Sequence, residues 1–358
     1  MIQYFTYIKT EEVKINNTKL RIDVGGNQMD IHDGNIIMHP EYSRKYYFYG
    51  MGYANCQLEH SWLPPQECPG IYRPFGRCGF RADHSIRLYT STDLVAWNLE
   101  SENILPLDSR PYGIYFRPKV IYNTETKKYV LWVNHLPDNW IPLLAYRKAR
   151  LLVATSDFPN GPFNVINENA NLKYKGAGDF TLMVDPKTSK AYVAYGAWSN
   201  SHSISIEELN RDYTDSTGVT TPIISPKDNE APILFERKGY YYLLFGHICC
   251  FCKEGSGIEV WIAKHPLGPW TSMNTEINPI TKSTRKRVIQ AQANYVFQVV
   301  NNQTGNITYV YTGDRWGSAS DNLKSHDLQY WYPLTFDDGK NPAEILPMSF
   351  LDEFTLDL

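Results

Sequence analysis

No run of about 18 consecutive apolar residues occurs in this 358-residue chain, so no transmembrane helix is expected. An excess of one charge is also missing, because 35 basic and 38 acidic residues leave a formal net charge of -3. That charge is too small to attract nucleic acid or an anionic membrane. The one basic cluster, Lys282 to Arg287, is short and predicts a solvated loop. We therefore expect neither nucleic acid nor a membrane as a partner.

Helical periodicity is weak along the whole chain, which excludes the dinucleotide-binding and TIM-barrel folds because both need alternating amphipathic helices. The Walker, H-E-x-x-H and G-x-G-x-x-G motifs are absent as well. Ser325-His326-Asp327 is no catalytic triad, because consecutive strand residues point to opposite faces. No change in composition marks a boundary, so we expect one domain over residues 1–358, with residues 1–27 as an N-terminal lead-in.

The N-terminus has no secretory signal, because its apolar residues 1–5 are soon followed by Lys9 and Glu11. The protein is then either intracellular or without its leader. The even number of six cysteines favours the second reading, since grouped cysteines are typical of disulfides in an oxidising compartment. They lie in two loops, as Cys56, Cys68, Cys78, Cys249, Cys250 and Cys252.

Pairing six cysteines allows 15 connectivities, and a zinc site is the alternative, although the chain has no pair of C-x-x-C motifs. Three glycosylation sequons, at Asn16, Asn302 and Asn306, agree with disulfides. We expect a secreted protein or one of the endomembrane or vacuolar system.

Aromatic residues are abundant, at 14% of the chain, with 26 tyrosines. A Tyr-rich, strand-like phrase that follows a Gly or Lys turn recurs five times. Five copies give about 72 residues per unit, enough for a four-stranded blade with insertions. The sequence therefore predicts an all-β fold, a five-bladed β-propeller. The copies lie at residues 45–50, 128–132, 190–195, 239–245 and 307–311.

Three segments each place one acidic residue beside apolar strand residues: Asp33 in 31–37, Asp179 in 178–182 and Glu230 in 229–233. Each precedes a Tyr-rich phrase, in units one, three and four. The innermost strands of propeller blades converge on a central channel, so acids at equivalent strand positions meet there. For one acid alone, a turn residue at a strand end is the ordinary reading. Recurrence in three units favours a shared cleft.

Three carboxylates in one cleft are suited to cleaving bonds between sugars. One carboxylic acid protonates the leaving oxygen, and a carboxylate assists the attack. A third acid raises the pKa of the first, because neighbouring like charges resist double ionisation. The residues therefore predict a glycosidase.

Six motifs in order, IHDGNII, FRPKVIYN, GDFTLMVD, NEAPILF, AQANYVF and TGDRW, resemble glycoside hydrolase family 43. They look most like its branch with exo-β-1,3-galactanases, from about residue 28 to the C-terminus. The resemblance implies a five-bladed propeller without a separate carbohydrate-binding module. It also implies inverting, exo-acting hydrolysis of terminal galactose or arabinose from an oligosaccharide or polysaccharide. By resemblance, Glu230 is the general acid, Asp179 its modulator and Asp33 the general base.

No cofactor is required by this reading. Some relatives hold calcium in the channel, but no set of calcium ligands can be recognised in this sequence. The alternative function is a non-catalytic glycan-binding propeller that has kept the family scaffold.

The base has two candidates. The galactanase branch reads AHGGGI where this chain has IHDGNII, and there a Gln that matches Gln292 takes the base role. Aspartate is the better base, because an amide is hardly basic near neutrality. We expect Asp33 to activate water and Gln292 to hold water or a sugar hydroxyl. Phe116 stands where the branch has Glu, which weakens any claim to the same sugar.

Further substrate-binding residues are expected among arginine, histidine and tryptophan side chains. Arginine forks bind hydroxyls or carboxylates, and the alternative for both arginines is a buried ion pair, for instance with Asp314. The histidine lies beside the base or in the core, and the tryptophans are sugar platforms or core residues. These candidates are Arg117, Arg315, His32, Trp198 and Trp316.

Overall fold

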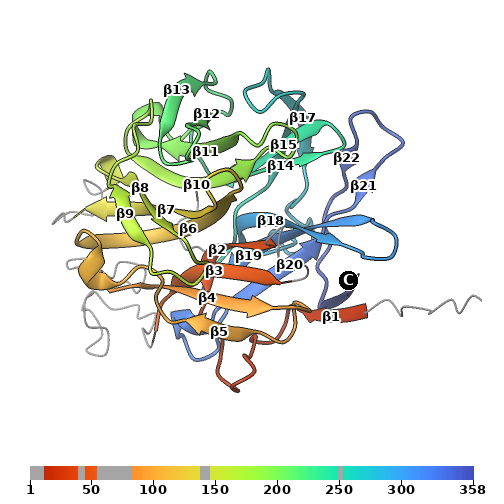
Figure 1. Ribbon diagram of the computed structural model, residues 1–358. Helices are drawn as coiled ribbons and strands as arrows, with labels where there is room; N and C mark the ends of the chain where they lie inside the picture. The colour runs from red at the N-terminus through yellow and green to blue at the C-terminus, as the bar shows by residue number, and fades with distance from the viewer. Residues whose placement is uncertain (1–11, 39–44, 55–82, 138–145, 249–252) are drawn as a thin grey trace, which may run out of the picture.

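The computed structural model describes residues 12–38, 45–54, 83–137, 146–248 and 253–358 (Figure 1). This part of the chain is built almost entirely of β-strands, with three short 3-10 helices, η1 (Leu107–Ser109), η2 (Trp198–Asn200) and η3 (Lys324–His326). None of its helices is long and apolar enough to cross a membrane. The predicted disulfides lie outside the described residues, because all six cysteines fall in 55–82 and 249–252.

Five antiparallel sheets, each from one continuous stretch of chain, surround a common centre (Figure 1). The first three sheets have four strands each. They are β2 (His32–Met38), β3 (Tyr46–Gly52), β4 (Ser85–Ser91) and β5 (Asn98–Ser101); β6 (Gly113–Asn123), β7 (Lys128–Pro137), β8 (Arg150–Ser156) and β9 (Asn164–Asn167); and β10 (Ala177–Val184), β11 (Ala191–Ala197), β12 (Ile204–Leu209) and β13 (Ser216–Thr220).

The fourth sheet has four strands and the fifth has three. They are β14 (Asn229–Arg237), β15 (Tyr240–His247), β16 (Glu259–Ala263) and β17 (Thr271–Glu276); and β18 (Gln292–Val300), β19 (Ile307–Arg315) and β20 (Leu328–Pro333). Two further pairs lie outside the blades, β1 (Glu12–Asn16) with β23 (Glu353–Asp357), and β21 (Phe336–Asp337) with β22 (Glu344–Ile345).

The first strand of each blade contacts the first strands of both neighbouring blades, so β2, β6, β10, β14 and β18 form a closed ring. The prediction of a five-bladed propeller is therefore confirmed. Each Tyr-rich phrase lies on the second strand of its blade. Those strands are covered by the neighbouring blades, which accounts for their large, strand-favouring side chains.

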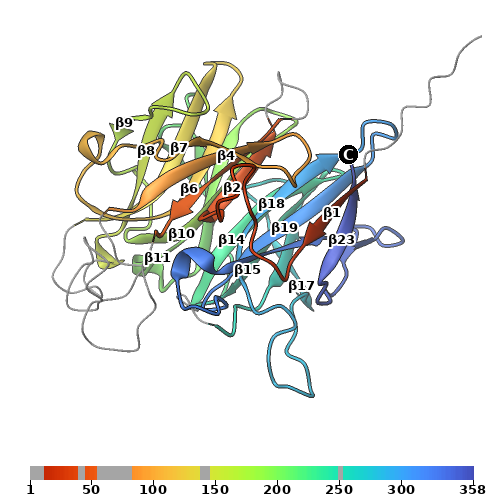
Figure 2. The same ribbon diagram turned by 90° about the horizontal axis from the view of Figure 1, so that it is seen from below.

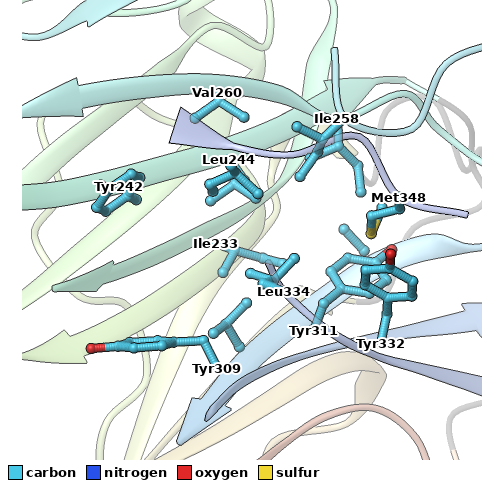
Figure 3. Close-up of a cluster of buried hydrophobic side chains, with 14 of the residues drawn as sticks. Ile233, Tyr242, Leu244, Ile258, Val260, Tyr309, Tyr311, Tyr332, Leu334 and Met348 are labelled. Atoms are coloured by element: carbon cyan, nitrogen blue, oxygen red, sulfur yellow. The ribbon is translucent and has the colours of Figure 1, made fainter. Parts of the chain in front are cut away.

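The core consists of layers between adjacent blades. Figure 3 shows the layer between the fourth and fifth blades, where Ile233 and Leu244 face Tyr309 and Tyr311. Similar clusters fill the other four junctions. Each fully buried Leu or Ile side chain stabilises the folded state by about 1.5–3 kcal/mol. These layers therefore hold adjacent blades together.

The two ends of the described chain meet at the junction of the fifth and first blades. β1 pairs with β23, and Figure 2 shows the two strands side by side at the edge of the molecule. Just after β1, the buried Asn17 side chain donates to the Trp331 carbonyl at 2.8 Å and accepts from the Trp331 N–H at 2.9 Å. The N-terminal segment is thereby fixed to the outer strand of the last blade.

Candidate functional site

A bulge interrupts the first strand of every blade near its N-terminal end. The strand pairing shifts between His32 and Asn35, Phe116 and Lys119, Ala177 and Phe180, Glu230 and Ile233, and Ala293 and Tyr295. A bulge bends the strand and redirects a side chain. The five bulges therefore lie at the same end of the channel, where the inner strands begin.

The predicted acids lie at these bulges, but not at one register position. Asp33 is the first residue of its bulge, Asp179 the second, and Glu230 directly precedes its bulge. Arg117 opens the bulge of the second blade. Asp33 and Arg117 both have left-handed backbone, with φ of 59° and 49°, which is uncommon outside glycine.

The glycine after Asp33 is explained by close backbone packing. A Cβ on Gly34 would lie 1.6 Å from the Tyr49 carbonyl oxygen and 2.7 Å from the Gly50 Cα. Only glycine lets the first two strands of this blade approach so closely at the bulge. Gly34 therefore fixes the position from which the Asp33 side chain projects.

A pocket of about 200 Å³ opens at this end of the channel. All three predicted acids line it, together with Arg117, Trp198 and Gln292 from the predicted substrate-binding set. The structure thus brings together residues from all five blades. The other lining residues, which the sequence did not single out as ligands, are Phe116, Asn134, Tyr146, Gly178, Gly196, His202, Asn229 and Ile248.

Asp33 is 2% exposed, and both its backbone and its side chain form hydrogen bonds. Its N–H donates to Asp314 Oδ2 at 2.7 Å, and the Tyr53 hydroxyl donates to Asp33 Oδ2 at 2.8 Å. Burial raises the pKa of Asp33, and nearby Arg117 and the Tyr53 hydrogen bond oppose that rise. Asp33 Oδ1 has no hydrogen-bond partner within the described residues.

Asp179 forms an ion pair with Arg117, at 2.7 Å between Oδ1 and Nε. The ion-pair reading for Arg117 thus holds, with Asp179 as partner rather than Asp314. Arg117 Nη1 also donates to the Ala293 carbonyl at 2.9 Å, so Arg117 links blades two, three and five. Burial alone would lower the pKa of Arg117, but Asp179 and then Asp33 hold it above its ordinary value. Arg117 stays a cation between two acids.

Glu230 is coupled to Gln292 and Trp316. The Trp316 indole N–H donates to Gln292 Oε1 at 2.8 Å, and Gln292 Nε2 donates to Glu230 Oε1 at 2.6 Å. An indole nitrogen can only donate, so the Gln292 amide has one possible orientation. Both ends of that amide are therefore engaged with protein groups.

Three residues of the predicted substrate-binding set do not line the pocket. His32 is fully buried, with Nδ1 3.0 Å from Asp314 Oδ1. Burial lowers the pKa of His32, but Asp314 more than reverses this and raises it to about 8. Trp316 is 2% exposed, and the Lys324 ammonium lies 3.4 Å from its ring centroid. Its ring face is covered, so Trp316 is no sugar platform.

Arg315 also lies away from the pocket. Its guanidinium is 5.2 Å from the Phe350 ring centroid, and burial lowers its pKa. Asp314, the neighbour proposed as its ion-pair partner, binds His32 instead. Arg315 therefore offers no donor fork to a substrate in this pocket.

Several residues around the acids escaped the sequence reasoning. Tyr53, Lys119 and Asn294 bind Asp33, its carbonyl and Asp314 respectively. Lys119 and Asn294 lie within motifs already recognised, which was the only signal available for them. Among the described residues, no group of three or more His, Cys, Asp or Glu side chains could hold a metal ion.

Comparison with known proteins places the chain among glycan-cleaving enzymes. The family model of glycosyl hydrolases family 43 matches residues 77–339, most of the chain. No curated protein sequence gives a match.

Solved structures with a similar fold include a β-1,3-galactosidase of family 43, at 25% identity and a TM-score of 0.72; the match covers 97% of this chain and 64% of that one. The exo-β-1,3-galactanase from Clostridium thermocellum is 22% identical, with a TM-score of 0.73, over 96% of this chain and 67% of that one. The exo-β-1,3-galactanase from Phanerochaete chrysosporium, solved with β-1,3-galactotriose, is 22% identical, with a TM-score of 0.70, over 96% and 68%. This chain therefore spans about two thirds of the length of these three proteins.

Proposed function

This chain belongs to glycosyl hydrolase family 43, and on that premise we propose that it hydrolyses glycosidic bonds with the carboxylates of its channel pocket. Glu230 is the general acid, Asp33 the general base and Asp179 the modulator of the acid. The observation that carries the proposal is the convergence of these three carboxylates, from blades one, three and four, on one pocket. Carboxylates gathered in a cleft are the groups that this reaction needs.

The contacts favour Asp33 over Gln292 as the base. Gln292 Oε1, the only weakly basic atom of that amide, already accepts a hydrogen bond from Trp316, which lowers its ability to accept a proton from water. Tyr53 holds Asp33 Oδ2 and leaves Oδ1 to accept a proton from water. Gln292 then serves the acid, because its N–H bond to Oε1 fixes the Glu230 carboxyl.

We propose that the reaction inverts configuration, and the acid and the base lie on blades that leave space between them. Blades one and four are not neighbours in the ring, so Asp33 and Glu230 face each other across the channel. In inverting glycosidases the two carboxyl groups are about 6.5–9.5 Å apart, with a water between them. Asp179 lies beside them in an ion pair with Arg117, which supports the role of modulator that we propose for it.

Pocket size supports release of one terminal sugar at a time. The pocket of about 200 Å³ is smaller than the roughly 300–1,000 Å³ of sites for drug-sized ligands. Trp198 offers an aromatic wall for a sugar ring. Three buried atoms of lining residues, Arg117 Nη2, Asp179 Oδ2 and Asn229 Oδ1, have no hydrogen-bond partner among the described residues, and sugar hydroxyls would supply one.

For the sugar we propose terminal galactose or arabinose. Galactose is the sugar of the β-1,3-galactosidase and of the two galactanases with similar folds. Phe116 lines the pocket, and its ring offers no donor or acceptor to a sugar hydroxyl. Phe116 therefore selects among sugars by their shape.

The test is hydrolysis of a panel of galactose- and arabinose-terminated glycans, with the anomer of the first product read by NMR. We expect release of single sugars with inverted configuration. Glu230→Gln should lower kcat by about 10²–10⁴-fold without changing the thermal midpoint, because it removes the proton donor and keeps the shape. Lys190→Met, in the exposed turn between β10 and β11, is the control.

Unchanged turnover by Glu230→Gln would refute the assignment of the acid. Tight binding of a glycan by the wild-type protein without hydrolysis of any panel member would identify a glycan-binding propeller instead. A product of retained configuration would contradict the roles given to Asp33 and water.

A further inference from the structure

The backbone of Asp33 adopts a conformation that needs support. Its φ of 59° lies in the left-handed region, which costs a residue with a side chain about 1–3 kcal/mol unless its surroundings impose it. The peptide groups on both sides of this residue are buried in the channel wall. Contacts to these groups therefore decide where the Asp33 carboxylate points.

Lys119, from the adjacent blade, binds the carbonyl side of this bulge. Its ammonium donates to the Asp33 carbonyl at 2.6 Å and to the Gly34 carbonyl at 2.8 Å. Two of its three protons are thus used by consecutive carbonyls of one bulge. On the other side, Asp314 Oδ2 accepts the Asp33 N–H. Lys119 thus binds the bulge on its carbonyl side, and Asp314 binds it on its N–H side.

Lys119 is an unusual residue to find here. It is 0% exposed and forms no ion pair with a carboxylate among the described residues. A buried ammonium without a counter-ion is expensive, and packing alone would be better served by an apolar side chain. Burial, and next Arg117, lower the pKa of Lys119 to about 7, whereas the negative charge of Asp33 raises it.

We propose that Lys119 is a positioning residue for the catalytic base: by binding the Asp33 and Gly34 carbonyls, it holds the Asp33 carboxylate at the attacking water. The inference rests on the proposed role of Asp33. Lys119 touches no reacting atom, and its effect on the reaction passes through the bulge.

Lys119→Met tests this proposal, because methionine fills the site without donating. We expect kcat to fall by about tenfold to a hundredfold, since displacing a catalytic group by about 1 Å has effects of that size. KM should change less than about threefold, because Lys119 does not line the pocket. The acidic limb of the kcat/KM profile should move to higher pH, because Asp33 loses a neighbouring cation.

A double-mutant cycle separates positioning from general damage. In an Asp33→Asn background, Lys119→Met should change the residual kcat less than about twofold, since the group that it positions has already been lost. An equal fall of kcat in both backgrounds, or an unchanged kcat and pH profile in the single variant, would overturn the proposal. Lys190→Met again serves as the lysine control.

Lys119→Gln covers the possibility that the methionine variant does not fold, as judged by near-ultraviolet circular dichroism. Glutamine keeps one polar donor end, so its kcat should lie between wild type and the methionine variant. A glutamine variant as active as wild type at all pH values would contradict the proposal. Full activity of Asp33→Asn alone would instead refute the proposed function, whatever Lys119 variants show.

Discussion

Asp33 and Glu230 accept hydrogen bonds from different protein groups. Asp33 accepts a hydrogen bond from Tyr53, and Glu230 accepts one from Gln292, which in turn is held by Trp316. Each carboxyl therefore has one oxygen fixed by protein. A hydrogen bond to the charged form lowers a pKa, so Tyr53 counteracts part of the rise that burial causes in Asp33.

Removing this hydrogen bond should change the pH dependence of the reaction. Tyr53→Phe raises the pKa of Asp33, because the charged form loses a donor. A base must be unprotonated, so the acidic limb of kcat/KM should move to higher pH. We expect kcat/KM at pH 5 to fall by roughly tenfold, the size of a hydrogen bond to a charged group, and to fall less at pH 7.

Tyr49→Phe is the matched control. Tyr49 lies on β3, four residues before Tyr53, and is equally buried, but its hydroxyl donates to the Pro159 carbonyl at 2.9 Å, away from the pocket. Its pH profile should match wild type. Superimposable profiles for the two variants would argue against Tyr53 as a partner of the base.

The residues that the sequence revealed are those with a local pattern. Asp33, Asp179 and Glu230 each begin an apolar strand, so they could be found one at a time and compared. Tyr53 and Lys119 lie 20 and 86 residues from Asp33, and nothing near them in sequence indicates a contact. His32 and Trp316 were expected to bind substrate because they lie in recognised motifs. In the structure both are buried and neither lines the pocket.

At the scale of the element, the bulge is the feature that the sequence did not predict. Acidic residues beside apolar segments identified three of the inner strands, β2, β10 and β14, and repetition of Tyr-rich phrases identified the second strands. A shift of register by one residue leaves no separate compositional signal. The acids were therefore expected at equivalent positions, whereas each occupies a different position relative to the bulge of its own blade.

Two glycines at corresponding bulges predict effects of very different size for the same substitution. Gly34→Ala would force a Cβ to within 1.6 Å of a backbone oxygen, whereas at Gly178 the nearest atom would be 3.8 Å away. We expect Gly34→Ala to lower the free energy of unfolding by more than about 3 kcal/mol or to prevent folding. Gly178→Ala should change it by less than about 1 kcal/mol.

Urea unfolding of the two variants, followed by tryptophan fluorescence, makes the comparison. If both variants lose the same stability, backbone crowding at β2 and β3 is not the reason for Gly34.

At the scale of the molecule, the propeller must close between its first and fifth blades. No strand of the first blade comes from the C-terminus, so closure depends on the junction itself. One buried cluster joins the two blades to β1 and β23, and Asn17 binds the backbone of Trp331. Five copies of a phrase predicted the number of blades, but the closing contacts involve residues more than 300 positions apart, which no local pattern encodes.

Asn17→Ala should weaken this closure. It leaves the buried Trp331 N–H and carbonyl without their partner, which costs about 1–3 kcal/mol for each group left unpaired. We expect the free energy of unfolding to fall by about 2–4 kcal/mol in urea titrations. Thr18→Ala, at the exposed next position, is the control, and equal stability of the two variants would contradict a closing role for Asn17.

The repeated bulge also bears on how such an enzyme can diversify. Each blade presents one bulge to the channel, and the strand pairing on both sides of it is undisturbed. The second blade carries Arg117 as the first residue of its bulge, where the first blade carries Asp33. A single substitution at a bulge can thus exchange an acid for a cation or an amide while the scaffold stays the same. Evolution can vary the chemistry of this channel one blade at a time, without redesigning the ring that surrounds it.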